Sequence, residues 1–144
     1  MEIATIGFTQ SSAEHFFERL RRAGVRRLVD VRLNNSSQLA GFSKADDLAY
    51  FLRTLLDASY EHNLELAPTD ELLGAYRKKQ ISWPEYEQAF LDLMLERGVP
   101  AAVQREAFAE KTVLLCSEAT PDRCHRRIVA ELLSKSWGAS IEHL

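Results

Sequence analysis

Short apolar runs alternate with amphipathic segments along the chain, and this alternation predicts an α/β domain. The run Val113-Leu114-Leu115 is continuously apolar, which is typical of an interior strand of a parallel sheet with both faces covered. Residues 3–6 and 27–31 predict two further apolar strands, and residues 59–66 alternate as a shorter one. We expect residues 140–144 to supply a last strand.

Helical periodicity fills the segments between these strands. Ser11 and Glu14 have the spacing of a capping box, which predicts a helix that stops at Gly24. Its inward positions are Phe16, Phe17 and Leu20. A second helix is predicted from Ser43, with an inward stripe of Leu48, Phe51, Leu52, Leu55 and Leu56. The polar segment before it, residues 34–41, is long enough to serve as a lid.

Residues 70–110 have helical periodicity throughout. We expect three helices there: residues 70–79, a helix capped by Ser82 and Glu85, and residues 100–110. An insertion of this length between strands exceeds the usual crossover. It therefore predicts a cap over the edge of the sheet or a pairing surface for a homodimer. Trp83 is the functional candidate of this segment, although a buried packing role is the simpler account.

The order of these elements predicts the fold class. Strands that alternate with helices favour a three-layer α/β fold with a mostly parallel, Rossmann-like sheet and helices on both faces. With 144 residues, of which 46% are hydrophobic, the chain has the size of one domain with a full core. We therefore expect a single domain over residues 1–144, with a helical insertion at about 70–110.

Composition narrows the function classes. A net charge of −3 gives no overall basic field, which disfavours a general nucleic-acid binder and leaves only a local basic patch for nucleic acid. A local basic run of Arg19, Arg21, Arg22, Arg26 and Arg27 is more often a solvated helix face. No apolar run reaches the ~20 residues of a membrane span, and no charged leader precedes one. Two cysteines then favour a reducing, cytoplasmic setting.

The segment after the central apolar strand collects much of the chain's reactive chemistry. Cys116 ends the strand, and a helix is predicted with Thr120 as its N-cap and Pro121 at its first position. At about 100° per residue along the helix, the side chain of His125 points towards the sheet, while those of Cys124 and Arg126 fall on opposite flanks of the helix. The helix N-terminus would favour a neutral imidazole, an acidic thiol or a bound phosphate.

Other polar residues follow the remaining strands at the carboxyl edge, where open α/β sheets bind ligands. Asp30 and Arg32 follow the second strand, where they either bind a ligand or form a structural ion pair that ties the loop. His62 lies near the end of the third strand, where it either joins the site or has a structural role. Gly7, after the first strand, would let a phosphate approach the following helix. No G-x-G-x-x-G or P-loop motif occurs, so no dinucleotide or nucleotide-triphosphate site of the standard kinds, and no cofactor, is predicted.

Short motifs along most of the chain resemble those of DUF488, a family of small bacterial and archaeal proteins. They are Thr5-Ile6-Gly7, Asp30-Val31-Arg32, Tyr60-Glu61-His62, Cys116-x-Glu118, Cys124-His125-Arg126 and Ile141-Glu142-His143. The family usually has a His where this chain has Phe8, and often Leu-Gly-Gly where it has Leu66-Ala67-Pro68. The resemblance implies the fold and the place of the site, and it favours a functional role for Asp30 and Arg32.

Several chemistries fit the two cysteines. Zinc is disfavoured, because adjacent helical residues such as Cys124 and His125 diverge and no C-x-x-C spacing occurs. A disulfide or redox pair of Cys116 and Cys124 requires their Cα atoms within about 7 Å. A nucleophilic Cys124 is better supported, since the helix end and Arg126 would lower its pKa. A buried, packed thiol is the plain alternative for either cysteine.

Two functional hypotheses follow. The first is a hydrolase or transferase for an anionic, nucleotide-like small molecule, with catalytic residues Glu118, Cys124 and His125. Its substrate-binding residues are Gly7, Asp30, Arg32, His62, Cys116 and Arg126, and no metal is assigned. The second is a non-catalytic module that senses such a ligand with the same residues. A purely structural role for the Cys-His-Arg turn is also open.

Overall fold

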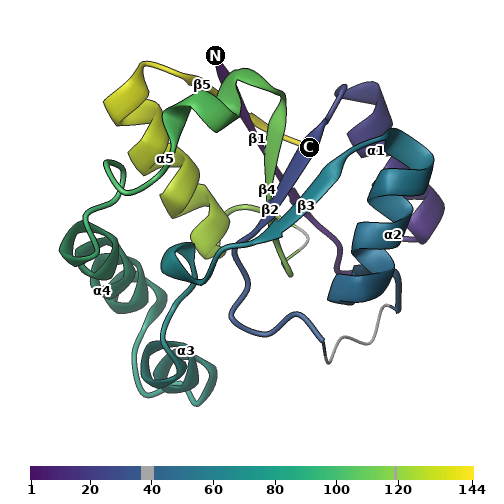
Figure 1. The fold of residues 1–144 in the computed structure, drawn as a ribbon. Coiled ribbons are helices and arrows are strands. Elements are labelled where there is room, and N and C mark those ends of the chain that lie inside the picture. The colour runs from purple at the N-terminus through teal and green to yellow at the C-terminus, as the bar shows by residue number, and fades with distance from the viewer. Residues whose placement is uncertain (37–40, 119) are drawn as a thin grey trace.

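The computed structural model describes residues 1–36, 41–118 and 120–144, in which strands and helices alternate (Figure 1). The strands are β1 (Glu2–Gly7), β2 (Arg27–Asp30), β3 (Ser59–His62), β4 (Thr112–Cys116) and β5 (Ser140–His143). The α-helices are α1 (Ala13–Arg22), α2 (Ala45–Leu56), α3 (Asp70–Arg77), α4 (Trp83–Glu96) and α5 (His125–Trp137). Short 3₁₀ turns cover Gly41–Ser43, Leu64–Leu66 and Arg105–Ala109.

The five strands form one parallel sheet in the order β3-β2-β4-β1-β5. The connection from β2 leads outward to β3, whereas the connection from β4 passes over β1 to β5. Neighbouring strands whose connections leave in opposite directions create a crevice at their carboxyl ends. Gly7 pairs with Cys116 and Asp30 with Leu115, so the carboxyl ends of β1, β2 and β4 lie level at this crevice.

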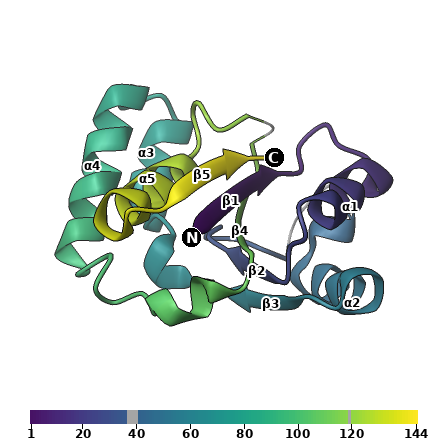
Figure 2. The same ribbon diagram turned by 90° about the horizontal axis from the view of Figure 1, so that it is seen from above.

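Helices cover both faces of the sheet, which confirms the predicted three-layer α/β fold (Figures 1 and 2). Residues 112–116 are all buried, and their side chains alternate between two apolar cores. Val113 and Leu115 pack with α1 and α2, and Leu114 and Cys116 pack with α4 and α5. A central strand buried on both faces explains why this run lacks polar alternation.

The first two helices begin at other residues than predicted. Ser12, not Ser11, caps α1, because its side chain accepts a hydrogen bond from the N–H of His15 at 3.1 Å, while the N–H of Ser11 still turns back to Phe8. Helix α2 begins after Lys44, because the buried Ser43 belongs to the preceding 3₁₀ turn. Leu55 is 45% exposed and lies outside the inward stripe.

The insertion follows the prediction only in part. Strand β3 ends at His62, since residues 64–66 turn as a 3₁₀ helix capped by Asn63. Helices α3 and α4 form as predicted, and α4 has the Ser82–Glu85 capping box. The third predicted helix is absent from residues 100–110, where local turns follow Gly98 and residues 105–109 make only a 3₁₀ segment packed through Phe108.

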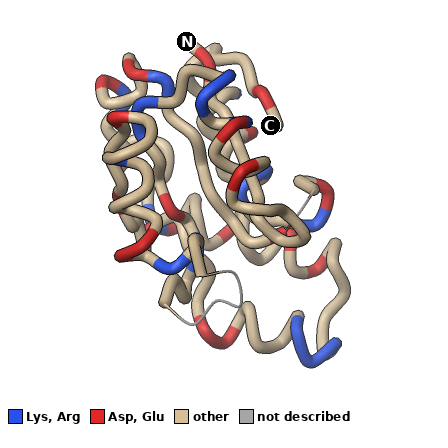
Figure 3. Tube along the Cα trace, turned by 90° about the vertical axis from the view of Figure 1, so that its right-hand side faces the viewer, with Lys and Arg blue, Asp and Glu red and all other residues tan. Residues whose placement is uncertain are grey.

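Positive and negative charges are mixed over the described residues. In the view of Figure 3, acidic and basic positions are interspersed along the chain. Within the basic run of α1 and β2, Arg21 pairs with Glu18, and Arg27 pairs with Glu61 at 2.7 Å. Among the described residues, no helix is long and apolar enough to cross a membrane. The predicted lid lies partly at residues 37–40, outside the described residues.

Candidate functional site

Helix α5 begins later than predicted, and this shift decides the geometry of the site. Cys124 is its N-cap residue, with extended backbone angles (φ −139°, ψ 134°), so neither Thr120 nor Pro121 starts the helix. The N–H of Cys124 instead closes a turn onto the carbonyl of Pro121 at 3.3 Å. Because Cys124 precedes the regular helix, the angular divergence expected of adjacent helical residues does not apply to it and His125.

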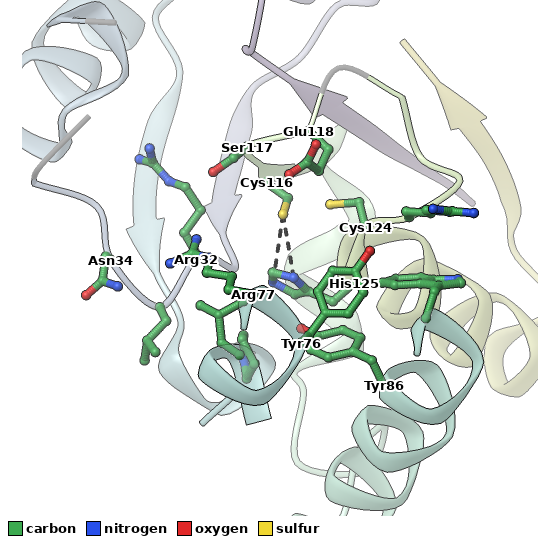
Figure 4. Close-up of a pocket in the computed structure, with 15 residues that line it drawn as sticks. Arg32, Asn34, Tyr76, Arg77, Tyr86, Cys116, Ser117, Glu118, Cys124 and His125 are labelled. Carbon is green, nitrogen blue, oxygen red and sulfur yellow. Dashed lines mark hydrogen bonds between the residues drawn. The ribbon is translucent and has the colours of Figure 1, made fainter. Parts of the chain in front are cut away.

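Two thiols and an imidazole meet at the carboxyl end of β4 (Figure 4). The Sγ atom of Cys116 lies 3.5 Å from Nδ1 of His125, and the ligand atoms of Cys116, Cys124 and His125 all lie within 4.8 Å of one another. His125 is directed to the sheet as predicted, and its Nε2 lies 2.6 Å from the carbonyl oxygen of Val31. Since a carbonyl only accepts, Nε2 carries a hydrogen, and Nδ1 is the ring nitrogen that faces the thiol of Cys116.

Arg126 is fully buried beside this cluster rather than on the opposite flank from Cys124. Its Nη1 atom lies 3.7 Å from Sγ of Cys124 and donates to the carbonyl of Glu118 at 2.5 Å. No carboxylate among the described residues lies within ion-pair distance of it, and its Nη2 has no hydrogen-bond partner there. A buried guanidinium needs nearby negative charge, and the thiols are the groups that can supply it.

The electrostatics contradict the predicted acidity of Cys124. Burial raises the pKa of Cys116, but the hydrogen bond from Cys124, the charge of Arg126 and nearby backbone N–H groups outweigh burial, so this pKa is lowered. Burial raises the pKa of Cys124 well above its ordinary value, and its hydrogen bond to Cys116 acts in the same direction. The prediction of an acidic Cys124 is therefore wrong, and Cys116 is the more acidic thiol.

The cluster forms the floor of a cavity of about 500 Å³. Ser117 and Glu118 line it from the loop after β4, and Arg32, Leu33 and Asn34 line it from the loop after β2. Helices α3 and α4 supply the opposite wall with Leu73, Tyr76, Arg77, Trp83 and Tyr86, and Pro68 and Arg123 complete the lining. The insertion thus covers the edge of the sheet, as predicted.

An aromatic series runs from the mouth of this cavity to His125. The rings of Trp83 and Tyr86 stack with centroids 5.2 Å apart, and Tyr76 lies 5.0 Å from Tyr86. Phe90 continues the series, 6.2 Å from Tyr86 and 5.2 Å from the imidazole of His125. These contacts connect the wall to His125, and Tyr76 and Trp83 are only partly buried.

Asp30 and Arg32 pair with each other rather than with the open cavity. Arg32 donates from Nε and Nη2 to the two carboxylate oxygens of Asp30 at 2.8 and 2.7 Å, and Tyr60 donates to the same carboxylate at 2.6 Å. Nη2 also reaches the carbonyl of Ser43, and the guanidinium lies over the ring of Phe8 at 5.1 Å. The charge of Arg32 is therefore compensated within the protein.

The remaining predicted site residues hold the backbone in place. Nε2 of His62 lies 2.7 Å from the carbonyl of Arg32, and His62 does not line the cavity. Gly7 does not line it either, because the carbonyl of Glu118 fills the space beside it. Of the nine predicted residues, the structure gathers five around the cavity: Arg32, Cys116, Glu118, Cys124 and His125.

Helices α3 and α4 and the loop before α5 bring to the cavity residues that were not predicted from the sequence. Tyr76, Arg77, Tyr86 and Arg123 were not predicted as site residues, and Trp83 was a functional candidate for which a packing role was the simpler account. A usable signal was present in the sequence, since aromatic residues recur in the first two helices of a segment predicted to cap the sheet edge. The spatial proximity of these aromatics to Cys116 was not readable from spacing.

These features define the class: a parallel α/β protein with a cavity at the carboxyl edge of the sheet, floored by two thiols and an imidazole. The chain belongs to the family described as "Domain of unknown function DUF488", whose family profile matches residues 12–133. This match confirms the resemblance noted from the motifs. No significant match was found among curated proteins or among solved structures.

Proposed function

We propose that this chain is a hydrolase or transferase that acts on an anionic small molecule with a planar, nucleotide-like group. The observation that carries the proposal is the composition of the cavity. The thiols of Cys116 and Cys124 and the imidazole of His125 line its floor, aromatic side chains form one wall, and arginine side chains also line it. Cavities with a few convergent polar groups at the switch point of an α/β sheet are common sites for small ligands.

The cations available to the ligand are Arg77 and Arg123. Both are exposed, both line the cavity, and neither has a carboxylate within ion-pair distance among the described residues. Arg32 and Arg126, the two arginines predicted to bind the anion, are buried: Arg32 pairs with Asp30, and Arg126 donates to the carbonyl of Glu118 and does not line the cavity. We therefore transfer the role of anion binding to Arg77 and Arg123, whose guanidinium groups suit carboxylates and phosphates.

The planar part of the ligand would lie against Tyr76 and Trp83, whose rings line the cavity and are only partly buried. Aromatic rings stack on flat heterocycles whichever heterocycle is present, because stacking does not require matched hydrogen-bonding groups. Glu118 is exposed at the opposite side of the cavity, in the position of a group that exchanges protons with the substrate. The thiol and imidazole groups below it form the reactive centre.

A binding experiment tests the anion site. Nucleoside monophosphates and inorganic phosphate are titrated into the wild-type chain and into the double variant Arg77→Ala/Arg123→Ala. We expect the double variant to bind about 10- to 100-fold more weakly, because it loses charge-assisted hydrogen bonds. The control Arg22→Ala removes an exposed arginine of α1 outside the cavity and should leave binding unchanged. Equal affinity in the double variant and wild type would overturn the assignment.

Turnover separates an enzyme from the non-catalytic module. Substitution Glu118→Gln keeps the shape of the side chain and removes its capacity to take up a proton. For an enzyme we expect unchanged ligand affinity and a loss of about 10²- to 10⁴-fold in turnover of phosphate esters of the bound class. Tight binding by the wild type without turnover of any bound ester would support the sensing module and contradict hydrolysis.

A further inference from the structure

We infer that Cys116, Cys124 and His125 bind a thiophilic divalent metal ion, of which Zn²⁺ is the best fit, with a free coordination position facing the cavity. This inference deepens the proposed function, because the metal would be its reactive centre. It corrects the sequence-based argument against zinc, which rested on the absence of a C-x-x-C spacing and on the divergence of Cys124 and His125 in a regular helix, and the structure removes the second of these grounds. Cys124 is the N-cap, and the three ligand atoms converge within 4.8 Å.

The distances suit a tetrahedral site. Ligands about 2.0–2.3 Å from a tetrahedral Zn²⁺ lie roughly 3.5–3.8 Å from one another. The Cys116 Sγ to His125 Nδ1 separation of 3.5 Å is already in this range, and no ligand pair exceeds 4.8 Å. A shift of about 1 Å, within the reach of a cysteine side-chain rotation, brings the widest pair into the tetrahedral range.

The surroundings provide what metal-bound histidine and cysteine need. The Nε2–H group of His125 donates to the carbonyl of Val31 at 2.6 Å, which fixes the ring and directs the Nδ1 lone pair towards the thiols. Nη1 of Arg126 lies 3.7 Å from Sγ of Cys124. A donor at this position stabilises a thiolate ligand, and outer partners of both kinds are typical of metal centres.

The burial of the Arg126 guanidinium also supports a metal site. Arg126 is fully buried, has no carboxylate partner among the described residues and keeps Nη2 without a hydrogen bond there. Two thiolates held by a divalent ion would place negative sulfur atoms permanently beside this guanidinium. A pair of neutral thiols would leave it without counter-charge.

The donor set selects the metal. Thiolate and imidazole ligands favour Zn²⁺ over Mg²⁺ or Ca²⁺, which require oxygen ligands. Three protein ligands with one open position are characteristic of catalytic rather than structural zinc. All three ligands line the cavity, so the open position is reachable by a substrate or a water molecule. Such an ion would acidify bound water, and Glu118, which lines the same cavity, would receive the proton.

The test measures metal without any substrate. The untagged full chain is expressed in zinc-supplied medium, dialysed and assayed by mass spectrometry for metal content. We expect about one Zn²⁺ per chain, and addition of Co²⁺ to the metal-free chain should produce a thiolate-to-cobalt charge-transfer band. Cys124→Ser and His125→Ala should lose the band and most of the metal. The control His15→Ala removes an exposed histidine of α1 and should retain both.

Each outcome has a distinct meaning. Substoichiometric metal in the wild type, together with no cobalt–thiolate band, overturns the inference whether or not the variants fold. Equal metal loss in His15→Ala and His125→Ala would mean adventitious surface binding and overturn it too. A Cys116–Cys124 disulfide in the freshly isolated chain, detected as a mass loss of two hydrogens, would also contradict it. Stoichiometric metal without turnover would refute the proposed hydrolase and leave the metal site standing.

Discussion

The backbone carbonyl of Glu118 occupies the space in which residue 7 would carry a side chain, because a Cβ atom on Gly7 would lie 1.6 Å from that oxygen. The same oxygen accepts the hydrogen bond from Nη1 of Arg126 at 2.5 Å. Gly7 was predicted to let a ligand approach the backbone. It instead lets the loop after β4 settle onto β1, which places both Glu118 and Arg126.

Substitution Gly7→Ala should therefore disturb the site through the backbone. The collision is with a carbonyl rather than a flexible side chain, so we expect a loss of about 1–3 kcal/mol in the free energy of unfolding. Metal content and turnover should fall as well, because the displaced loop directly follows the metal ligand Cys116 and carries Glu118. Urea denaturation and a metal assay measure both effects.

Gly74 provides the matched control. It lies within α3, where a Cβ would meet nothing within 4 Å. Gly74→Ala should raise the free energy of unfolding by about 0.5–1 kcal/mol, because alanine loses less backbone entropy in a helix. If Gly7→Ala were as well tolerated as Gly74→Ala, the role assigned to the Gly7–Glu118 contact would be wrong.

The buried pair of Asp30 and Arg32 makes a second prediction. Asp30→Asn leaves the Arg32 guanidinium buried without its counter-charge and should cost about 3–5 kcal/mol in the free energy of unfolding. The double variant Asp30→Asn/Arg32→Met removes the stranded charge, so it should be more stable than Asp30→Asn alone. Chemical denaturation of the four proteins in this cycle measures the coupling, and additive losses would contradict it.

Helix α4 depends on its N-cap for the placement of the aromatic wall. The Ser82 hydroxyl accepts from the N–H of Glu85 at 3.3 Å, and Trp83 follows directly. Ser82→Ala should lower the free energy of unfolding by about 1 kcal/mol and weaken binding of planar ligands. Ser136→Ala, at an exposed position within α5, should change stability by less than about 0.5 kcal/mol. Matching losses in the two variants would argue against the cap.

Lys111 gives the stability a predictable pH dependence. Its ammonium group forms ion pairs with the carboxylates of Glu2 and Glu142, and the distance to Glu142 is 2.9 Å. These ion pairs connect the start of β4 to β1 and β5. The hydrogen bond from Lys111 lowers the pKa of Glu2 below its ordinary value. Burial lowers the pKa of Lys111, but the bonds to both carboxylates outweigh burial and raise it.

The two pKa shifts limit the stabilising contribution of these ion pairs at opposite ends of the pH range. The Glu2 contribution is fully present above the ordinary pKa of 4.5 and is lost as the pH falls through the lowered value. The Lys111 contribution is present below 10.5 and is lost as the pH rises through the raised value. Lys111→Met should remove both contributions, about 0.5–1 kcal/mol at neutral pH. Thermal unfolding across pH measures this, with Lys135→Met, at an exposed position of α5, as the control.

Local patterns in the sequence determined the elements and the layers. The uninterrupted apolar run of residues 113–115 required cover on both faces, and that requirement alone placed it inside a parallel sheet. The Ser82–Glu85 spacing located the start of α4 for a similarly local reason. The predicted N-cap was wrong where tertiary contacts intervened, as at Ser43, whose carbonyl accepts a hydrogen bond from the buried Arg32.

The members of the site were only partly readable. Cys116, Glu118 and His125 could be placed near one edge because strand polarity and helix direction fix them. The roles of Asp30 and Arg32 were not readable, because a buried ion pair and a ligand-binding pair have the same sequence. Only the fold shows that Arg32 is already neutralised, whereas Arg77 and Arg123 line the cavity without carboxylate partners among the described residues.

The sequence by itself thus determined an α/β sheet whose central strand ends in reactive groups, because hydrophobic periodicity and helix direction are properties of neighbouring residues. Tertiary structure alone decided that Cys124 stands before the helix, that its thiol meets Cys116 and His125, and that Tyr76 and Trp83 face them. These relations join residues up to about fifty positions apart through packing and buried charge, which no local pattern records.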